Sequence, residues 1–518
     1  MSDEDEGVHR TPTTGDVRLE ATLTPAPAEV GSNGQGGQSG QTETRKPRDA
    51  ELLRLCGDIL PFHTADGEAF ADVVIQDHRE TFAIESPDFK NWLLHRYFMK
   101  AGRAPGDDAL KSAVGTLVLR ARFNGPQLSV FVRVGKHGGN IYVDLADDQR
   151  NVVEITPAGY NVVKAAPVRF VRPKLLRALP KPQPGGSIDD IRAILNVQQE
   201  HDLVLVVAWA LTALNPALQC PLLGFHGEAG SAKTTAARLV RQLIDPSSAP
   251  VRAVPRDPKD IFLATSNSRV VVYDNVSRLS PQVSDLLCQI VTGGNFTTRK
   301  LYTDREEISL SGRNPIILTG IGDFIGRSDL LDRTITVTLC PIPGSQRKSE
   351  SEVQAAFNEA HPRILGLLFD ATAMGLNKFP NTRLAELPRM ADFVLWGTAC
   401  EPAFGWPQGT VASAFAANQR EGVLRAVEAD PLSAAILGFM RDRPTWMGTP
   451  TELLTELRKS TTADDVKSLP TNASALGQLL DRITTSLRKI GVEIARAREG
   501  KGRERKITIT RWADEIHD

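Results

Sequence analysis

The order of apolar and polar positions predicts an α+β domain in the first third of the chain. Short apolar runs at 70–75 and 130–134 are typical of strands, whereas residues 91–98 have a helical spacing of apolar side chains. The two glycines before Asn140 indicate a hairpin turn. We therefore expect residues 50–179 to form an α+β accessory domain, without a side-chain pattern typical of catalysis.

Two segments of biased composition mark the ends of this domain. Residues 1–48 are rich in Thr, Pro, Gly and Gln and carry few apolar side chains, which predicts a disordered tail. The segment from Leu179 to Gly186 is rich in proline and glycine, which predicts a stiff linker and a domain boundary. The following apolar stretch, Leu203 to Leu214, is too short to span a membrane and predicts a buried helix.

The last third of the chain predicts helices followed by a small mixed domain. Periodic apolar positions indicate a helical region over residues 350–430. Thr449 and Glu452 have the spacing of a capping box, so a helix is expected to begin between them. Residues 431–512 are predicted to form three helices and then two short strands, an order typical of a winged helix.

The most informative stretch lies between these regions and predicts a phosphate-binding loop. An apolar strand pattern over 222–225 meets a small-residue loop, and a helical pattern begins near Thr234. Backbone N–H groups of such a loop and the positive end of the new helix bind phosphate, while the lysine reaches the β/γ-phosphates and the threonine holds Mg²⁺. The predicted ATP-binding residues are Gly227, Glu228, Ala229, Gly230, Ser231, Ala232, Lys233, Thr234 and Thr235.

One position departs from the usual loop pattern. Ala232 stands immediately before Lys233, where the motif has glycine. Alanine is the smallest residue with a Cβ, so the loop can still close, but a positive φ at Ala232 would be strained. An ordinary strand-to-helix turn with an unrelated lysine is the alternative interpretation.

A second apolar strand supplies the acid that a phosphate loop needs for its metal. Residues 269–273 are apolar apart from Arg269 and end at Asp274, which we assign to Mg²⁺ together with Thr234. The following residue is Asn275, where many such ATPases have a water-activating glutamate. An amide can orient water but cannot take its proton, so hydrolysis would depend on positioning and charge neutralisation.

Charge and cysteine content narrow the protein class. Lys and Arg total 61 against 62 Asp and Glu, so any nucleic-acid surface must be local. The five cysteines are scattered and odd in number, which argues against a disulfide framework or a zinc site. The acidic N-terminus does not have the pattern of a signal peptide. These features predict a cytoplasmic protein without a membrane partner.

From about His201 to Leu339 the chain resembles the core of the superfamily 3 helicases found in phage and plasmid primase–helicases. The resemblance includes the apolar helix before the loop and the Thr-Gly-Gly-Asn and Thr-Arg-Lys-Leu-Tyr sequences between 292 and 302. From about residue 70 onward the chain also resembles bacterial putative ATP-binding proteins with Gly-Ser-Ala-Lys in this loop. The implied fold is α/β, with an AAA+-like P-loop NTPase core over residues 187–343.

The resemblance also implies roles for residues outside the loop. Arg299 and Lys300 would lie on a hairpin that tracks single-stranded DNA, Thr319 would lie near the sensor position, and Arg333 would reach the site of a neighbouring subunit in a ring. Each role has an alternative. A solvated hairpin face is the alternative for the two basic residues, because paired basic side chains are common on exposed turns. Thr319 could simply fill the strand, and Arg333 could pair with Asp332 or Asp329.

The C-terminal segment predicts a second nucleic-acid surface. Residues 482–511 hold ten Lys or Arg and three Asp or Glu, an excess that suits sequence-independent contact with a phosphate backbone. Protein contact is the alternative role for such a domain. The predicted DNA-contacting residues in this segment are Arg496, Arg498, Lys501, Arg503 and Arg505.

Two functions remain open from the sequence. The first is a DNA-stimulated ATPase that resembles a helicase of replication or mobile-element maintenance, with Lys233, Asp274, Asn275 and Arg333 as its catalytic residues. The second is a nucleotide-gated DNA-binding scaffold that binds ATP with little turnover. No polymerase-type carboxylate pair or zinc cluster is apparent, so any primase would be a separate partner.

Overall fold

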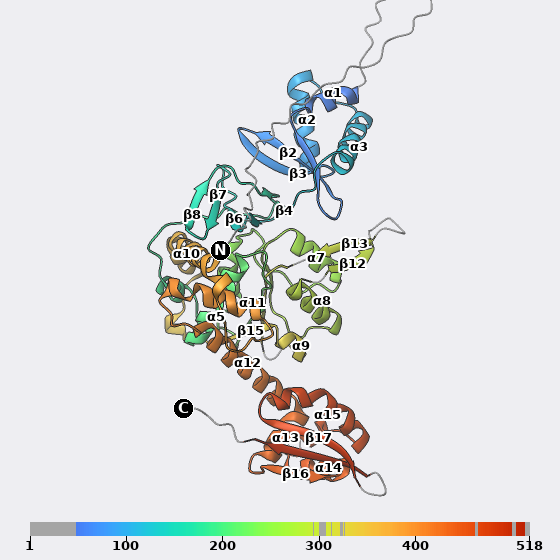
Figure 1. The fold of residues 1–518 in the computed structure, drawn as a ribbon, viewed down its shortest axis with the longest axis vertical. Helices are drawn as coiled ribbons and strands as arrows, with labels where there is room; N and C mark the ends of the chain where they lie inside the picture. Colours follow the sequence, from blue (N-terminus) through green and yellow to red (C-terminus); the bar gives the residue numbers. More distant parts are fainter. Residues whose placement is uncertain are drawn as a thin grey trace, which may run out of the picture. The chain divides into compact units, whose positions relative to one another are not determined.

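The computed structural model describes residues 48–293, 295–299, 307–311, 313–321, 325, 327–461, 465–499 and 504–512. The predicted tail over residues 1–48 lies, except for Arg48, outside the described residues. The described chain is a mixed α/β protein with several separate sheets (Figure 1), and its four-stranded sheet around β10 is parallel.

The first described segment is an antiparallel sheet covered by helices. Its helices are α1 (Arg48–Leu55), α2 (Pro87–Ala101) and α3 (Asp107–Phe123), and its strands are β1 (Leu60–His63), β2 (Ala69–Ile75) and β3 (His78–Ala83). The Ser86 hydroxyl accepts the N–H of Phe89 and fixes the start of α2. The strand expected at 70–75 and the helix expected at 91–98 are both confirmed, and the segment has its own apolar core.

A second antiparallel sheet follows, in the order β5-β6-β7-β8. Its strands are β5 (Val134–His137), β6 (Asn140–Asp144), β7 (Val152–Thr156) and β8 (Gly159–Val163), and a small pair joins β4 (Val130–Phe131) to β9 (Arg169–Phe170). The hairpin turn before Asn140 is confirmed. The strand expected over 130–134 is instead interrupted at Arg133, which has a φ of +65° and a fully buried side chain that pairs with Asp245 at 3.3 Å.

The predicted domain over residues 50–179 therefore contains parts of three different apolar cores. Buried side chains of the second sheet, including Ile141 and Val153, belong to the core that also contains the parallel sheet. The predicted linker is packed as well: Leu179 is buried, and a Cβ on Gly186 would lie 2.2 Å from the carbonyl oxygen of Arg363. Contact with a helix distant in sequence, which composition does not reveal, holds this proline-rich segment in place.

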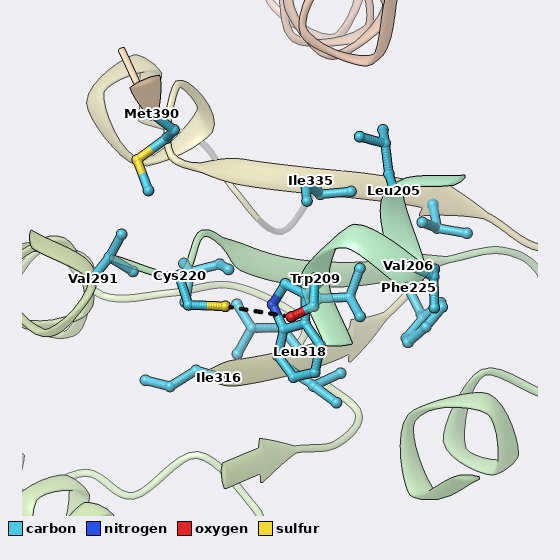
Figure 2. Close-up of a cluster of buried hydrophobic side chains, with 14 of the residues drawn as sticks. Leu205, Val206, Trp209, Cys220, Phe225, Val291, Ile316, Leu318, Ile335 and Met390 are labelled. Carbon is cyan, nitrogen blue, oxygen red and sulfur yellow. Dashed lines mark hydrogen bonds between the residues drawn. The ribbon is translucent and has the colours of Figure 1, made fainter. Parts of the chain in front are cut away.

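The parallel sheet has the order β11-β14-β10-β15. Its strands are β10 (Leu222–His226), β11 (Val271–Tyr273), β14 (Ile316–Gly320) and β15 (Thr334–Thr338). Both faces of the sheet are covered, so its strands are almost wholly buried, and β11 is the apolar run that the sequence pattern indicated. Helix α5 (Glu200–Ala213) is buried along nearly its whole length, and Trp209 donates through Nε1 to the Pro221 oxygen at 2.8 Å. Figure 2 shows the apolar cluster in which Trp209 lies among side chains of α5 and of the parallel sheet.

Further elements surround the parallel sheet. They are α4 (Ile188–Ile194), α6 (Lys233–Ile244), α7 (Pro258–Ser266), α8 (Pro281–Thr292), the hairpin of β12 (Asn295–Arg299) and β13 (Glu307–Ser311), α9 (Ser328–Leu331) and the 3-10 turn η1 (Gly344–Gln346). The predicted helical region comprises α10 (Glu350–Lys378), η2 (Phe379–Asn381), α11 (Ala391–Cys400), η3 (Glu401–Phe404) and α12 (Thr410–Ala429).

The C-terminal segment contains three helices and a three-stranded sheet of order β16-β18-β17. In chain order these are α13 (Pro431–Met440), β16 (Thr445–Gly448), α14 (Pro450–Ser460), η4 (Asp465–Ser468), α15 (Ala473–Arg488), β17 (Val492–Glu499) and β18 (Glu504–Arg511). The capping box of Thr449 and Glu452 is confirmed. The sequence analysis missed β16, a four-residue strand that pairs with β18.

Within the part of the chain that the structure describes, no helix is both long and apolar enough to cross a membrane.

Candidate functional site

The loop between β10 and α6 has the backbone conformation that its small residues permit. Gly227 has a φ of +150°, and a Cβ there would lie 2.4 Å from the Leu339 carbonyl oxygen. Gly230 has a φ of +82°. Ala232 has a φ of +62°, which is the left-handed conformation that the sequence analysis describes as strained for an alanine. The loop thus turns sharply enough for α6 to begin at Lys233.

The Lys233 side chain folds over its own loop. Its Nζ donates to the carbonyl oxygens of Gly227 at 2.8 Å and Glu228 at 2.7 Å, while the Ser231 hydroxyl donates to the Glu228 oxygen at 2.9 Å. Partial desolvation lowers the pKa of Lys233, and the nearby carboxylate of Asp274 opposes this shift. The ammonium group is therefore held by the carbonyl oxygens of its own loop.

Asp274 connects the loop to two neighbouring strands of the parallel sheet. The Thr234 hydroxyl donates to Asp274 Oδ1 at 2.8 Å. The Thr319 hydroxyl, at the end of β14, donates to the same oxygen. These contacts join Thr319 to the pair of residues, Thr234 and Asp274, that the sequence assigned to one metal. They orient one carboxylate at the carboxyl ends of the strands.

Asn275 has an unusual backbone conformation next to this carboxylate. Its φ is +56°, and its N–H donates to the Thr319 hydroxyl at 3.0 Å. The Thr319 hydroxyl therefore accepts from Asn275 and donates to Asp274, so it has polar partners at the site and does more than fill space in the strand. Asparagine is among the residues that tolerate left-handed backbone, which gives a structural reason for its presence here.

The residues present fit a hydrated magnesium ion. Mg²⁺ is commonly held by one or two protein oxygens together with phosphates and water. The Thr234 hydroxyl and the Asp274 carboxylate are hard oxygen donors 2.8 Å apart. No group of three or more His, Cys, Asp or Glu residues with metal-binding geometry occurs in the described ranges. The donor set thus fits Mg²⁺ that arrives with a nucleotide better than a permanently held metal.

A cavity of about 770 Å³ extends from the loop and was not apparent from the sequence. It is lined by Gly230, Ala232, Thr234 and Thr235 at the loop and the start of α6, and also by residues 193–196, 198, 341–343, 346–348 and 350. Asn196 joins these segments, because its Nδ2 donates to the Ser231 oxygen at 3.1 Å and to the Cys340 oxygen at 2.9 Å. None of these added segments carries a recognisable motif.

Arg333 lies outside the contacts that join the loop to Asp274. Its Nη1 donates to the Asp329 carbonyl oxygen at 2.6 Å, and its side chain is partly buried. The Asp332 carboxylate pairs with Arg389 at 3.2 Å and also with Lys489. The sequence offered an ion pair of Arg333 with Asp332 or Asp329 as the alternative role. The contact that the structure shows for Arg333 is the hydrogen bond to the Asp329 backbone oxygen.

The predicted DNA-contacting residues are only partly described. The backbone of Arg299 lies at the end of β12 and that of Arg498 lies in β17, whereas Lys300, Lys501 and Arg503 lie outside the described residues. Arg496 is exposed and pairs with Asp481 at 3.0 Å. Arg505 is exposed on β18. Arg496 and Arg505 are therefore both exposed, and Arg496 already has the carboxylate of Asp481 as a partner.

Comparisons with known proteins give the class. Residues 188–414 match the family model described as the actinomycete integrative conjugative element replication protein, and residues 432–515 match the model of the AICE RepA C-terminal domain. Both models describe replication proteins, and the matches identify a replication-related function for this chain. The first match contains the loop, Asp274, Thr319 and the cavity-lining residues.

Other comparisons add less. A search of curated proteins found no match. Among solved structures, the A form apo structure of the NrS-1 C-terminal region is 12% identical and covers 89% of this chain and 98% of its own, with a TM-score of 0.41. Another apo structure of this region (residues 305–718 in its title) is also 12% identical and covers 90% and 100%, with a TM-score of 0.38.

Proposed function

We propose that this replication-related chain is a P-loop ATPase that resembles the superfamily 3 helicases and couples ATP hydrolysis to DNA remodelling. The observation that carries the proposal is the convergence of Lys233, Thr234, Asp274 and Thr319 at one edge of a parallel sheet. Ligands of open α/β sheets bind at the carboxyl ends of the strands, and a phosphate loop followed by a helix supplies the anion site there.

The chain's own residues have distinct parts in this proposal. Lys233 would exchange the loop carbonyls for phosphate oxygens, and the N–H groups of residues 230–234 would bind the same phosphates. Thr234 and Asp274 would hold Mg²⁺, which when bound neutralises phosphate charge. Thr319 keeps the Asp274 carboxylate oriented, and Asn275 would orient the attacking water without taking its proton.

The replication context supports DNA as the partner. The β12–β13 hairpin is the proposed contact for single-stranded DNA, and the exposed face of β18 is the proposed contact for a phosphate backbone. Assembly into a homo-oligomeric ring, in which Arg333 would serve a neighbouring subunit, and cooperation with a separate primase belong to the same proposal.

The deciding experiment is steady-state ATP hydrolysis by the purified full chain, with and without single-stranded DNA. The expected result is turnover that DNA stimulates and that Lys233→Ala abolishes together with ATP binding. Lys259→Ala, on α7, is the matched control because Lys259 is outside the loop and does not line the cavity. Unchanged ATP affinity in Lys233→Ala would refute the proposal.

A second candidate function rests on Asn275. A site whose water-orienting residue is an amide can bind ATP tightly and hydrolyse it slowly, which suits a nucleotide-gated DNA-binding scaffold. Tight ATP binding with negligible turnover, both with and without DNA, would favour this candidate over the motor.

A further inference from the structure

The segment between β15 and α10 is tied directly to the phosphate loop. The N–H of Leu339 donates to the His226 oxygen at 2.8 Å, and the N–H of Ile342 donates to the Gly230 oxygen at 3.2 Å. Asn196 adds a side-chain bridge between Ser231 and Cys340. Residues 339–347 therefore form a cover along one side of the loop, and we call them the cover segment.

Arg347 ends the cover segment against the loop. Its Nε donates to the Ile342 oxygen at 3.2 Å, which turns the guanidinium group back over the segment. Its Nη2 lies 2.9 Å from the position that a Cβ on Gly230 would occupy. The absence of a side chain at Gly230 is thus what allows the guanidinium group to approach the loop backbone.

The cavity beside Arg347 has an excess of positive charge. Arg238, Arg347 and Lys348 line it, and Glu350 is the only carboxylate in the lining. Glu350 pairs with Arg238, so the charge of this acid is already matched. A ligand that enters between the loop and the cover segment therefore meets uncompensated positive charge, which suits an anion.

We propose that Arg347 is a phosphate-contacting residue that acts within its own chain and grips the diphosphate unit of a bound nucleoside di- or triphosphate from outside the loop. This inference rests on the proposed nucleotide-binding function and extends it to a residue with no motif. The loop N–H groups would bind the phosphates on one side, and the planar guanidinium fork would bind them on the other.

The same geometry implies a consequence for α10. Ser349 and Glu352 form a capping box at the start of this helix, and Glu350 in its first turn pairs with Arg238 of α6. Contact between Arg347 and phosphate would therefore fix the cover segment, the start of α10 and the phosphate loop to one ligand.

The test is equilibrium binding of ADP and ATP by the full-length protein, measured by calorimetry, and of adenosine, measured by competition. The variants are Arg347→Ala and Arg347→Lys, with Arg383→Ala as the control, since Arg383 is exposed, donates to the oxygens of Pro380 and Thr382 and does not line the cavity. Arg347→Ala should weaken ADP and ATP binding about tenfold, the usual scale of one charge-assisted hydrogen bond. Adenosine affinity should not change.

The outcomes separate this inference from the function on which it rests. If Lys233→Ala loses nucleotide binding while Arg347→Ala binds ADP like the wild type, the inference is overturned and the proposed function stands. If wild type itself does not bind ATP, the proposed function fails. An equal loss of affinity for adenosine in Arg347→Ala would overturn the inference, because it would show that Arg347 only shapes the cavity. Arg347→Lys should recover part of the ADP and ATP affinity, because the positive charge remains. Thermal unfolding of each variant shows whether weaker binding comes from the lost contact or from a less stable fold. Arg347→Gln is a second neutral variant, with a longer side chain than alanine, and should weaken ADP and ATP binding in the same way.

Discussion

Thr319 and Asp274 are joined by a hydrogen bond between the ends of two adjacent parallel strands, β14 and β11. The same hydroxyl accepts the N–H of Asn275, and the same carboxylate oxygen accepts the hydroxyl of Thr234. A single network thus connects Thr234, at the start of α6, to the two strands on which the proposed metal and water chemistry would depend.

The network predicts a measurable role for the Thr319 hydroxyl. Thr319→Val keeps the side-chain shape but leaves the Asn275 N–H without its acceptor and Asp274 without one donor. We expect a loss of roughly 1–3 kcal/mol in unfolding free energy and a larger fall in Mg²⁺-dependent ATP hydrolysis than in ATP affinity. Chemical denaturation and kinetic measurements check the two effects. Thr336→Val, a buried threonine of β15, is the control; an equal fall in hydrolysis in both variants would count against the network.

Ala232 predicts a stabilising substitution. At a φ of +62° an alanine is strained whereas a glycine is not, so Ala232→Gly should raise the unfolding free energy by about 0.5–1 kcal/mol after the entropy of the unfolded chain is counted. Ala237→Gly in the interior of α6 should lower it by roughly 1–2 kcal/mol, because this alanine is buried in a helix. Thermal unfolding of both variants is the measurement. A loss of stability in both would show that Ala232 is not strained.

Asn275 predicts how turnover depends on an acid at this position. Asn275→Glu introduces a proton acceptor beside Asp274, and a large gain in turnover would favour the scaffold, because the native site would then lack a base. Asn275→Gln is the matched control: its side chain has the length of glutamate, and at a φ of +56° it has the same backbone strain as Asn275→Glu, but it carries no carboxylate. Steady-state hydrolysis of all three proteins is compared at saturating ATP. No change in Asn275→Glu would indicate that the native site already has its base.

His361 predicts a loss of stability in mild acid. Burial lowers the pKa of His361 to about 4, against 6.5 for a free histidine, so the folded protein keeps the imidazole neutral where the unfolded chain is protonated. The unfolded state binds more protons between these pH values, so stability falls as pH drops from 6.5 towards 4, by on the order of 3 kcal/mol for this group. His361→Gln should show a smaller loss between pH 7 and pH 5 in urea unfolding.

The pH dependence of His361→Gln must be compared with that of wild type, because Asp202 changes the stability of the fold in the opposite direction as pH falls. Burial raises the pKa of Asp202 to about 6, so the folded state binds its proton more tightly than the unfolded chain does. Its contribution to stability therefore increases as pH falls through the same window. An identical slope in His361→Gln and wild type would contradict the prediction.

The C-terminal sheet predicts unequal effects from two arginines. Arg505→Ala should weaken binding to duplex DNA and reduce the salt dependence by about one charge. Arg496→Ala should have a smaller effect, because Arg496 already pairs with Asp481, whereas Asp481→Ala should strengthen binding by releasing that arginine. Fluorescence anisotropy over a range of salt concentrations measures all three. Equal losses for both arginines would show that the ion pair does not compete with DNA.

Much of the candidate site could be predicted from the sequence because its chemistry lies in short local patterns. The run from the apolar strand through Gly227 to Lys233 specifies a sharp turn, and an apolar strand ending at Asp274 specifies an acid at a sheet edge. The structure confirms the two strands and shows that Ala232 is left-handed. Arg347 and Asn196 could not be found in this way, since they reach the loop by contacts between segments distant in sequence.

By itself, the sequence determined the elements whose apolar spacing and capping residues act locally: the buried helix α5, the capping box of α14, and the strand and helix that flank the loop. The tertiary structure alone decided how these elements share cores. It packed the proline-rich segment 179–186 against α10, placed β16 beside β18 and buried Arg133 against Asp245. The physical reason is that side-chain periodicity encodes which face of an element is buried, whereas its partner depends on long-range packing and charge pairing.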